Sequence, residues 1–320
     1  MPTVLLTAIG SASAHAAHTA LTAAGCRVLG CDIYPRAWNV NAMEMEPFLN
    51  VPPATDAEAY TAALLDAVRA YGIEAVLPLT DVEVDVLCTR KPAFAALGAT
   101  VCCPEPAVAD LCRDKLRMAQ SLDAAGLCDV IPTWTRETLP AEPPYPLLLK
   151  PLRGRSSQAQ QVADDAQALA LALSQRADYI LQPYWPGDVY TVDCARDMHG
   201  NTVTLTRRER LRTVNGLGTA VEICPDHPLD AVCHGILAHV GLVGVVNMEF
   251  IRRGDTYRFL EINPRFSGGV GFSLLAGYDF VNAMLRCHAG LPLVLPPVFM
   301  PMTLAQRYEM RVTRRGGEDQ

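Results

Sequence analysis

The chain has 320 residues, half of them hydrophobic, and a formal net charge of −7. This length and apolar content suffice for two or three compact lobes, and the negative charge argues against an extended nucleic-acid-binding surface. No run of about 18 apolar residues occurs, and no charged segment precedes an apolar run at the start, so we predict neither a membrane span nor a secretory signal.

The eleven cysteines are scattered, mostly inside apolar runs, and none forms a C-x-x-C pair. An odd number of thiols in such surroundings is typical of small buried residues in a reducing compartment. We therefore expect no disulfide and no zinc site, and we predict a cytoplasmic protein.

The first hundred residues alternate between strand and helix patterns. Strands are predicted at residues 4–7, 27–32, 75–79 and 99–102, and helices at residues 13–24 and 57–71. This order predicts a parallel, doubly wound α/β lobe.

Two features of this lobe bear on ligand binding. Gly10 begins a loop of small residues and Asp32 follows about twenty residues later, but the G-x-G-x-x-G spacing of a dinucleotide site is missing. Asp81 and Glu83 follow the third strand, at the carboxyl edge where such sheets bind ligands. Solvated acids that cap the following helix would give the same pattern, so both interpretations stay open.

A helical region follows at residues 107–125, read as one or two helices. Asp114 and Lys115 lie near a helix start, and Gly126 is the stop signal. A lysine on a helix is commonly a solvated residue, so Lys115 by itself predicts no site.

A strand of the buried type then leads into a candidate phosphate loop. Residues 146–150 deliver Lys150, and the loop beyond contains Gly154, Ser156 and Ser157. The α- and β-phosphates of a nucleotide need an ammonium group and a loop whose N–H groups close over the anion. An ordinary strand end with a basic turn is the alternative.

Residues 179–193 are predicted to form a strand, a Pro/Gly connector and a second strand. An adenine ring needs donor and acceptor groups from an extended backbone beside a flat apolar wall. Gln182, Pro183 and Tyr184 fit this requirement. Farther along, four arginines lie within residues 207–212, where alternation places Arg208, Arg210 and Arg212 on one face. A basic edge that discourages sheet pairing is the alternative explanation for these arginines.

The most informative segment is FLEINPRFSGG at residues 259–269. Alternation puts Glu261 and Asn263 on one face of a strand, with Arg265 two residues farther on. A carboxylate and an amide oxygen beside a guanidinium suit magnesium held against phosphates.

The preceding strand, residues 243–251, carries Asn247 and Glu249 on one face. A hairpin turn at residues 252–255 joins the two strands. An even loop would place Glu249 and Glu261 on opposite faces, so the metal hypothesis predicts a three-residue loop at 253–255 or a bulge. Two solvent-facing carboxylates on an antiparallel pair are the alternative.

These motifs together resemble the ATP-grasp superfamily, and most closely its carbamoyl-phosphate-synthase-like branch. The resemblance covers residues 1–310 and implies an ATP-grasp fold, both α/β and α+β, with an N-terminal pre-ATP-grasp lobe. It divides the chain into a pre-ATP-grasp lobe (1–105), an ATP-grasp N-terminal subdomain (106–185) and a C-terminal subdomain with the metal site (186–320).

The resemblance also implies roles for individual residues. Glu249, Glu261 and Asn263 would hold Mg²⁺, which Mn²⁺ can replace, and Arg265, Arg210 and Arg212 would contact the transferring phosphoryl group or the acceptor. The remaining matches would bind ATP: Lys115, Lys150, Gly154, Ser156, Ser157, Gln182, Pro183 and Tyr184. One departure is Val189, where the family usually has a ribose-binding Glu; Asp188 would have to substitute.

The activity implied is that of a carboxylate–amine ligase. A small carboxylate would be activated by ATP as an acyl phosphate and attacked by an amine, giving an amide or peptide bond, ADP and phosphate. The arginines suggest amino acids or small derivatives as substrates. Relatives are commonly homodimers. A phosphotransferase on the same fold and a catalytically silent nucleotide-binding module are the alternatives.

Overall fold

Three β-sheets organise the chain, of which the computed structural model describes residues 2–154 and 159–314. The first sheet is parallel, with the order β3-β2-β1-β4-β5. Its strands are β1 (Thr3–Leu6), β2 (Arg27–Asp32), β3 (Phe48–Asn50), β4 (Ala75–Leu77) and β5 (Thr100–Val101).

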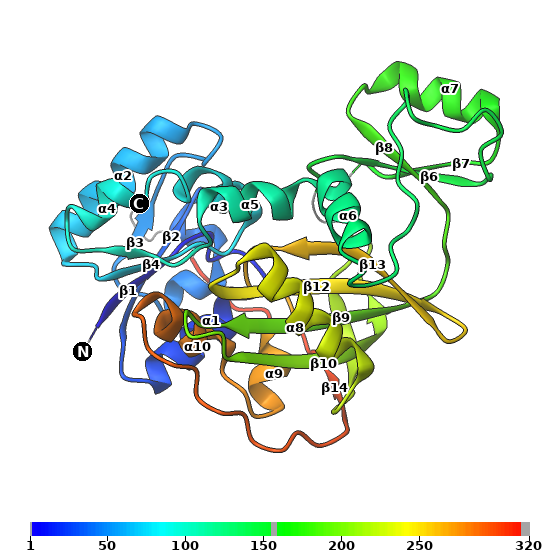
Figure 1. Ribbon diagram of the computed structural model, residues 1–320. Coiled ribbons are helices and arrows are strands. Elements are labelled where there is room, and N and C mark those ends of the chain that lie inside the picture. The colour runs from blue at the N-terminus through cyan, green and yellow to red at the C-terminus, as the bar shows by residue number, and fades with distance from the viewer. Residues whose placement is uncertain (1, 155–158, 315–320) are drawn as a thin grey trace.

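Helices cover both faces of this first sheet (Figure 1). They are α1 (Ala14–Ala23), α2 (Ala57–Tyr71), α3 (Asp81–Leu87) and α4 (Lys91–Ala95), with two short 3-10 turns, η1 (Arg36–Trp38) and η2 (Val40–Met43), between β2 and β3. The predicted parallel, doubly wound lobe is confirmed. Strand β3 and helix α4 were not predicted, because they are too short for a hydrophobic period to stand out.

A small lobe projects from the rest of the molecule (Figure 1). It consists of a three-stranded antiparallel sheet and one helix: β6 (Leu147–Pro151), β7 (Gln161–Ala163), α7 (Ala166–Gln175) and β8 (Tyr179–Pro183). Leu147, Leu149 and Leu181 form part of its own small core.

The third sheet is antiparallel, in the order β13-β12-β9-β10-β11-β14. Its strands are β9 (Asp188–Arg196), β10 (Thr202–Arg212), β11 (Gly218–Ile223), β12 (Gly244–Arg253), β13 (Thr256–Asn263) and β14 (Met302–Ala305). The helices associated with it are α5 (Pro106–Arg113), α6 (Lys115–Ala124), α8 (Pro228–Val240), α9 (Val270–Leu275) and α10 (Phe280–His288).

The two faces of this third sheet differ in chemistry. Val192, Met248 and Phe250 point to one face and pack in a core with α8. The opposite face is apolar where Ala195 packs with α10, but it becomes polar toward Glu249. Because successive strand residues alternate between faces, the polar positions gather on the side that faces the first sheet.

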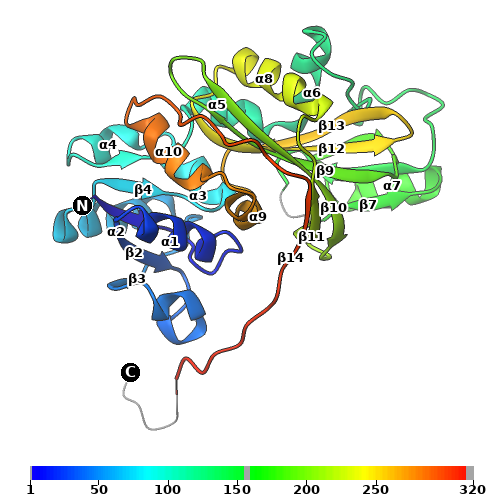
Figure 2. The same cartoon turned by 90° about the horizontal axis from the view of Figure 1, so that it is seen from below.

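Beyond β14 the chain runs back to the N-terminal lobe as an extended segment (Figure 2). There Arg311 pairs with Glu44 at 3.0 Å, and Thr313 donates a hydrogen bond to the carbonyl of Ala37 at 2.5 Å. All eleven cysteines are free thiols. Within the two described ranges, no helix is long and apolar enough to span a membrane.

Candidate active site

A β-bulge places the candidate metal ligands on one face of the β12–β13 hairpin. Arg253 pairs with Thr256, so the turn has two residues, and of the two predicted alternatives, a three-residue loop or a bulge, the structure has the bulge. The register shifts by one residue between Phe250 and Glu249, and the bulge places Glu249 opposite Glu261. A two-residue turn by itself would have put these carboxylates on opposite faces, and the extra residue in β13 corrects this.

The paired strands assemble a donor set that suits a hard cation. Asn263 donates from Nδ2 to Asn247 Oδ1 at 3.1 Å and to Glu261 Oε1 at 3.4 Å. Both hydrogen bonds leave from the nitrogen, so the amide oxygen of Asn263 remains for a ligand. Across the described part of the chain, no group of three His, Cys, Asp or Glu side chains is placed to hold a metal ion. The candidate set therefore consists of two carboxylates and an amide, which are ligands that Mg²⁺ accepts.

The electrostatics of the two glutamates support this fit. Burial raises the pKa of Glu249 and the adjacent Glu261 adds to the rise, although Arg212 opposes it. Burial also acts to raise the pKa of Glu261, but Lys115 and Lys150 outweigh it and the pKa lies below its ordinary value. Two facing carboxylates repel each other, and a bound divalent cation would relieve that repulsion.

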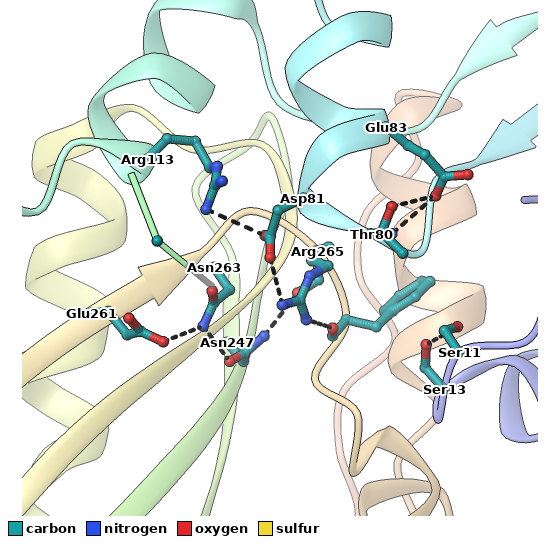
Figure 3. A network of polar contacts seen from close by, with 12 residues as sticks. Ser11, Ser13, Thr80, Asp81, Glu83, Arg113, Asn247, Glu261, Asn263 and Arg265 are labelled. Atoms are coloured by element: carbon teal, nitrogen blue, oxygen red, sulfur yellow. Dashed lines mark hydrogen bonds and ion pairs between the residues drawn. The ribbon is translucent and has the colours of Figure 1, made fainter. Parts of the chain in front are cut away.

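Arg265 is held from both sides (Figure 3). Its Nη2 donates to Asp81 Oδ2 at 2.7 Å and its Nη1 to the carbonyl of Phe266 at 2.9 Å. Asn247 Nδ2 donates to the backbone carbonyl of Arg265 at 3.1 Å. The buried Nε has no partner among the described residues. The guanidinium is therefore fixed beside the glutamates, and its Nε–H is among the donors left for a ligand.

Asp81 joins the N-terminal lobe to this site. Burial acts to raise its pKa, but Arg265 and Arg113 outweigh that effect, so the pKa of Asp81 is lowered and the side chain is an anion. Arg113 Nη1 lies 3.9 Å from Asp81 Oδ1 and comes from α5. Asp81 thus lies just beyond β4 and lines the cavity, so the ligand-binding interpretation stays a prediction.

Glu83 has the capping role of the other interpretation, but it is buried rather than solvated. It accepts hydrogen bonds from Thr80 N at 3.1 Å and Thr80 Oγ1 at 2.8 Å, and from Tyr60 OH at 2.9 Å. Burial raises its pKa although these bonds oppose the rise. Both carboxylate oxygens of Asp32 are also engaged: Oδ2 accepts a hydrogen bond from Gly10 N at 2.7 Å, and Oδ1 accepts one from Tyr34 N at 3.0 Å.

The arginines of β10 do not lie as alternation predicted. A register irregularity around Arg210 separates Arg212 from Arg208 and Arg210, which both lie near Glu222. Arg210 Nε lies 3.5 Å from Glu222 Oε1, outside the cavity, whereas Arg212 Nη2 lies 2.9 Å from Glu249 Oε2 within it. The shared face predicted for Arg208, Arg210 and Arg212 is therefore wrong for Arg212, the one of the three that the structure brings to the glutamates.

A buried network missed by the sequence analysis lies on the cavity face of the same strand. Arg207 donates to Asp193 Oδ2 at 2.6 Å, to Glu209 Oε1 at 3.1 Å and to Ser267 Oγ at 3.0 Å. Ser273 also donates to Asp193, at 2.5 Å. An acid at position 193 among the apolar residues of β9 was the available signal, because a buried charge needs a partner. The network fixes the Ser267 loop that follows Arg265.

On the other side of Glu261 lie the two predicted phosphate-binding lysines. Lys115 Nζ lies 3.3 Å from Glu261 Oε2 and donates to the carbonyl of Gly154 at 2.8 Å. Burial lowers the pKa of Lys150 to about 8; the electrostatic effect of Glu261 acts to raise it and that of Lys115 to lower it further. Ser156 and Ser157, the other predicted loop residues, lie outside the described residues.

The predicted adenine segment lies at the end of β8. Gln182 is buried and its Nε2 donates to Thr133 Oγ1 at 2.7 Å, while its Oε1 has no partner within the described ranges. The N–H of Tyr184, next to Pro183, already donates to the carbonyl of Pro146 at 2.8 Å. Asp188, at the start of β9, pairs with Arg208 at 2.7 Å, so in this arrangement its carboxylate is engaged away from the glutamates.

A cavity of about 870 Å³ lies between the first and third sheets. Its lining includes Glu249, Glu261 and Arg265 from the third sheet and the following loop, together with Asp81 and Tyr34 from the N-terminal lobe. The candidate metal ligands therefore stand between the lysines on one side and a large cavity on the other. This arrangement suits a reaction that passes a phosphoryl group from a nucleotide to a second substrate.

Comparison with known proteins agrees with this geometry. Residues 175–309 match a family described as "ATP-grasp in the biosynthetic pathway with Ter operon". The formate-dependent phosphoribosylglycinamide formyltransferase of Synechococcus sp. (strain WH7803) is 26% identical over 323 residues, which covers 92% of this chain and 79% of that protein.

Two solved structures show the same fold. One is the biotin carboxylase domain of Hydrogenobacter thermophilus 2-oxoglutarate carboxylase, in complex with MgADP, ADP and bicarbonate: 18% identity, TM-score 0.73, covering 91% of this chain and 70% of that one. The other is an L-amino acid ligase from Bacillus licheniformis, with 16% identity and a TM-score of 0.70, covering 90% of this chain and 74% of that one.

Proposed function

We propose that this chain is an ATP-grasp enzyme and, more specifically, an ATP-dependent carboxylate–amine ligase. The observation that carries the proposal is the position of Glu249 and Glu261, which face each other across the hairpin between buried lysines and the cavity. Phosphoryl transfer needs anion neutralisation on one side and room for an acceptor on the other.

The residues would bind different parts of the metal–nucleotide complex. Glu249, Glu261 and the amide oxygen of Asn263 would hold Mg²⁺, which when bound offsets the charge of the ATP phosphates. Lys115 and Lys150 would offset the charge that remains on the nucleotide side. Gln182, Pro183 and Tyr184 would contact the adenine, and Asp188 would reach the ribose only after releasing Arg208.

Arg265 and Arg212 would stabilise the phosphoryl group as it moves. A carboxylate oxygen of the substrate forms a bond to the γ-phosphorus of ATP while the bond to ADP breaks, which yields an acyl phosphate. The nitrogen of the amine then attacks the carbonyl carbon, phosphate leaves, and the nitrogen loses a proton to solvent. Arg210 takes no part in this assignment, because it points to Glu222 outside the cavity.

The test is Mg²⁺-dependent ADP release across a panel of carboxylates, with hydroxylamine as the trapping amine. We expect ADP and a hydroxamate with the native chain, and loss of both in Glu261→Gln. Glu222→Gln is the matched control, since Glu222 lies on β11 of the same sheet but outside the cavity. A phosphorylated product without hydroxamate would identify a phosphotransferase instead, and unchanged activity in Glu261→Gln would refute the site.

A further inference from the structure

The cavity reaches well beyond the groups needed for phosphoryl transfer. Its volume of about 870 Å³ lies near the upper end of what small-molecule sites usually enclose. The glutamates and Arg265 line its third-sheet side, while its opposite wall is built by the N-terminal lobe, including residues 32–34 and 38–41 after β2. A one-carbon acid would leave that wall untouched.

Two exposed aromatic side chains form a shelf on the N-terminal wall. Tyr34 and Trp38 are 54% and 75% exposed, and their ring centroids lie 6.1 Å apart at an interplanar angle of 32°. Ile33 and Val40, also exposed, extend the apolar surface. Single exposed apolar residues are ordinary on a protein surface, but adjacent aromatic rings that line a cavity offer a ring-shaped ligand a place to stack.

The backbone beneath this shelf is fixed although the rings are exposed. Asp32 accepts the N–H of Tyr34 at 3.0 Å, and Trp38 N donates to the carbonyl of Pro35 at 2.9 Å. The C-terminal segment braces the same turn through the hydrogen bond from Thr313 to Ala37. A fixed backbone lowers the entropy cost of binding, because little of the protein has to be ordered around the ligand.

The charges of this wall argue against a phosphorylated ligand. The N-terminal lobe contributes Asp32, Asp81 and Glu83 to the described lining and no lysine, arginine or histidine. The cavity's arginines, Arg207, Arg212 and Arg265, come from the other side. A phosphate placed on the N-terminal wall would meet carboxylates instead of the cations that phosphate recognition requires.

The loop before α1 does not reverse this conclusion. Gly10 lies at the start of the loop that leads into the helix, where backbone N–H groups commonly bind phosphate. Here, however, the N–H of Gly10 donates to the Asp32 carboxylate, and the hydroxyl oxygens of Ser11 and Ser13 lie 3.3 Å apart, within hydrogen-bond distance of each other. An anion at the N–H of Gly10 would have to displace a carboxylate that the fold itself supplies.

We infer that the carboxylate substrate carries a flat apolar group, an aromatic or comparable heteroaromatic ring, which stacks on Tyr34 and Trp38, and that it carries no phosphate. This inference rests on the proposed function, because it requires the carboxylate end to lie by the glutamates and Arg265. Aromatic amino acids and aryl carboxylates are the class that fits. The curated relative is named for a phosphoribosyl substrate, so the inference separates the two proteins by specificity.

The experiment compares three kinds of carboxylate in the hydroxylamine assay: aromatic amino acids and aryl carboxylates, small aliphatic acids, and phosphorylated acids. We expect kcat/KM to be at least about tenfold higher for the aromatic class. Trp38→Ala should raise KM for aromatic substrates about tenfold with kcat nearly unchanged, and Trp38→Phe should restore most of the loss. Tyr308→Ala is the control, since Tyr308 is an exposed aromatic outside the cavity lining.

Equilibrium binding of the same acids, measured by calorimetry in the presence of Mg²⁺ and ADP, separates this inference from the proposed function. Aromatic acids that bind the native chain but not Trp38→Ala, without hydroxamate formation, would support the shelf and reject the ligase. Preference for small or phosphorylated acids, or an equal response of Trp38→Ala and Tyr308→Ala, would overturn the inference. Thermal unfolding of each variant excludes loss of fold as the cause.

Discussion

Asp81 and Arg265 lie 184 positions apart in the sequence, yet Arg265 Nη2 donates to Asp81 Oδ2 across only 2.7 Å. One residue begins α3 in the N-terminal lobe, and the other follows β13 at the edge of the third sheet. The pair therefore couples the lobe that forms one wall of the cavity to the arginine assigned to phosphoryl transfer. Asp81 acts in this arrangement as a positioning residue, because it fixes the guanidinium without touching the reacting atoms.

We predict that Asp81→Asn lowers kcat by about tenfold to a hundredfold, as loss of an orienting partner does at other charged sites. KM for the carboxylate should change less, since the cavity keeps its shape. The free energy of unfolding should also fall, by about 3–5 kcal/mol if the pair behaves like other buried ion pairs that lose one member. Steady-state kinetics and urea unfolding measure the two effects.

Asp85→Asn provides the control for this prediction. Asp85 also binds Arg113, at 3.0 Å, but it is much more exposed and lies outside the cavity. A similar loss of kcat in both variants would mean that Arg113, rather than Arg265, transmits the effect of Asp81.

The adjacent arginines of β10 give a second prediction. Arg212→Ala should reduce kcat about a hundredfold, the usual cost of losing one charged donor at a developing anion, because Arg212 contacts Glu249. Arg210→Ala removes the same side chain two positions away, where it faces Glu222, and should change kcat by less than about twofold. If the two variants behave alike, the assignment based on the register irregularity is wrong.

That irregularity marks the limit of what the sequence could predict. Strict alternation along β10 groups Arg212 with Arg210, and only the irregular pairing with β11 moves Arg212 onto the cavity face. The same kind of event occurs in β13, where a bulge brings Glu261 opposite Glu249. In β13 a bulge could be anticipated, because the metal hypothesis required either an odd loop or a bulge; in β10 no such chemical requirement existed.

Contacts between lobes were beyond the sequence for a different reason. Residue types and local spacing identified Glu249, Glu261, Asn263 and Arg265, since these lie within two adjacent strands and the loop that follows. The partner of Arg265 depends on how the N-terminal lobe is placed against the third sheet, and hydrophobic periodicity carries no information about that placement. The aromatic shelf was not predicted either, because Tyr34 lies in a loop and Trp38 in a 3-10 turn, and neither segment has a periodic hydrophobic pattern.

The pKa of Lys150 gives a pH-dependent prediction. Its folded pKa of about 8 lies below the ordinary lysine value of 10.5, so the buried ammonium costs stability below about pH 8, and the cost fades as pH rises toward the unfolded pKa. ATP binding should show the opposite trend, because it needs the charged form. We expect the Kd for ATP to rise by up to about tenfold for each pH unit above 8 in calorimetry.

Two variants isolate this titration. Lys150→Arg keeps its charge throughout and should give a Kd that hardly depends on pH between 7 and about 9.5. Lys150→Met has no charge to lose and should bind weakly at every pH. If Lys150→Met retained the pH dependence of the native chain, another group would have to be responsible for it.

The connector between β8 and β9 offers a prediction about stability. Gly187 packs so closely on the hairpin that a Cβ there would lie 2.1 Å from the carbonyl oxygen of Arg252, a backbone atom that cannot rotate away. Gly187→Ala should therefore displace the connector, lower the free energy of unfolding by about 1–3 kcal/mol and weaken ATP binding through the adjacent Tyr184.

Gly235→Ala is the control: its Cβ would meet only the side-chain end of Leu127, at 3.2 Å. Because Gly235 lies within α8, where alanine favours the helix, this variant should be neutral or gain up to about 1 kcal/mol. Equal stability of the two variants in urea unfolding would show that the connector yields without cost.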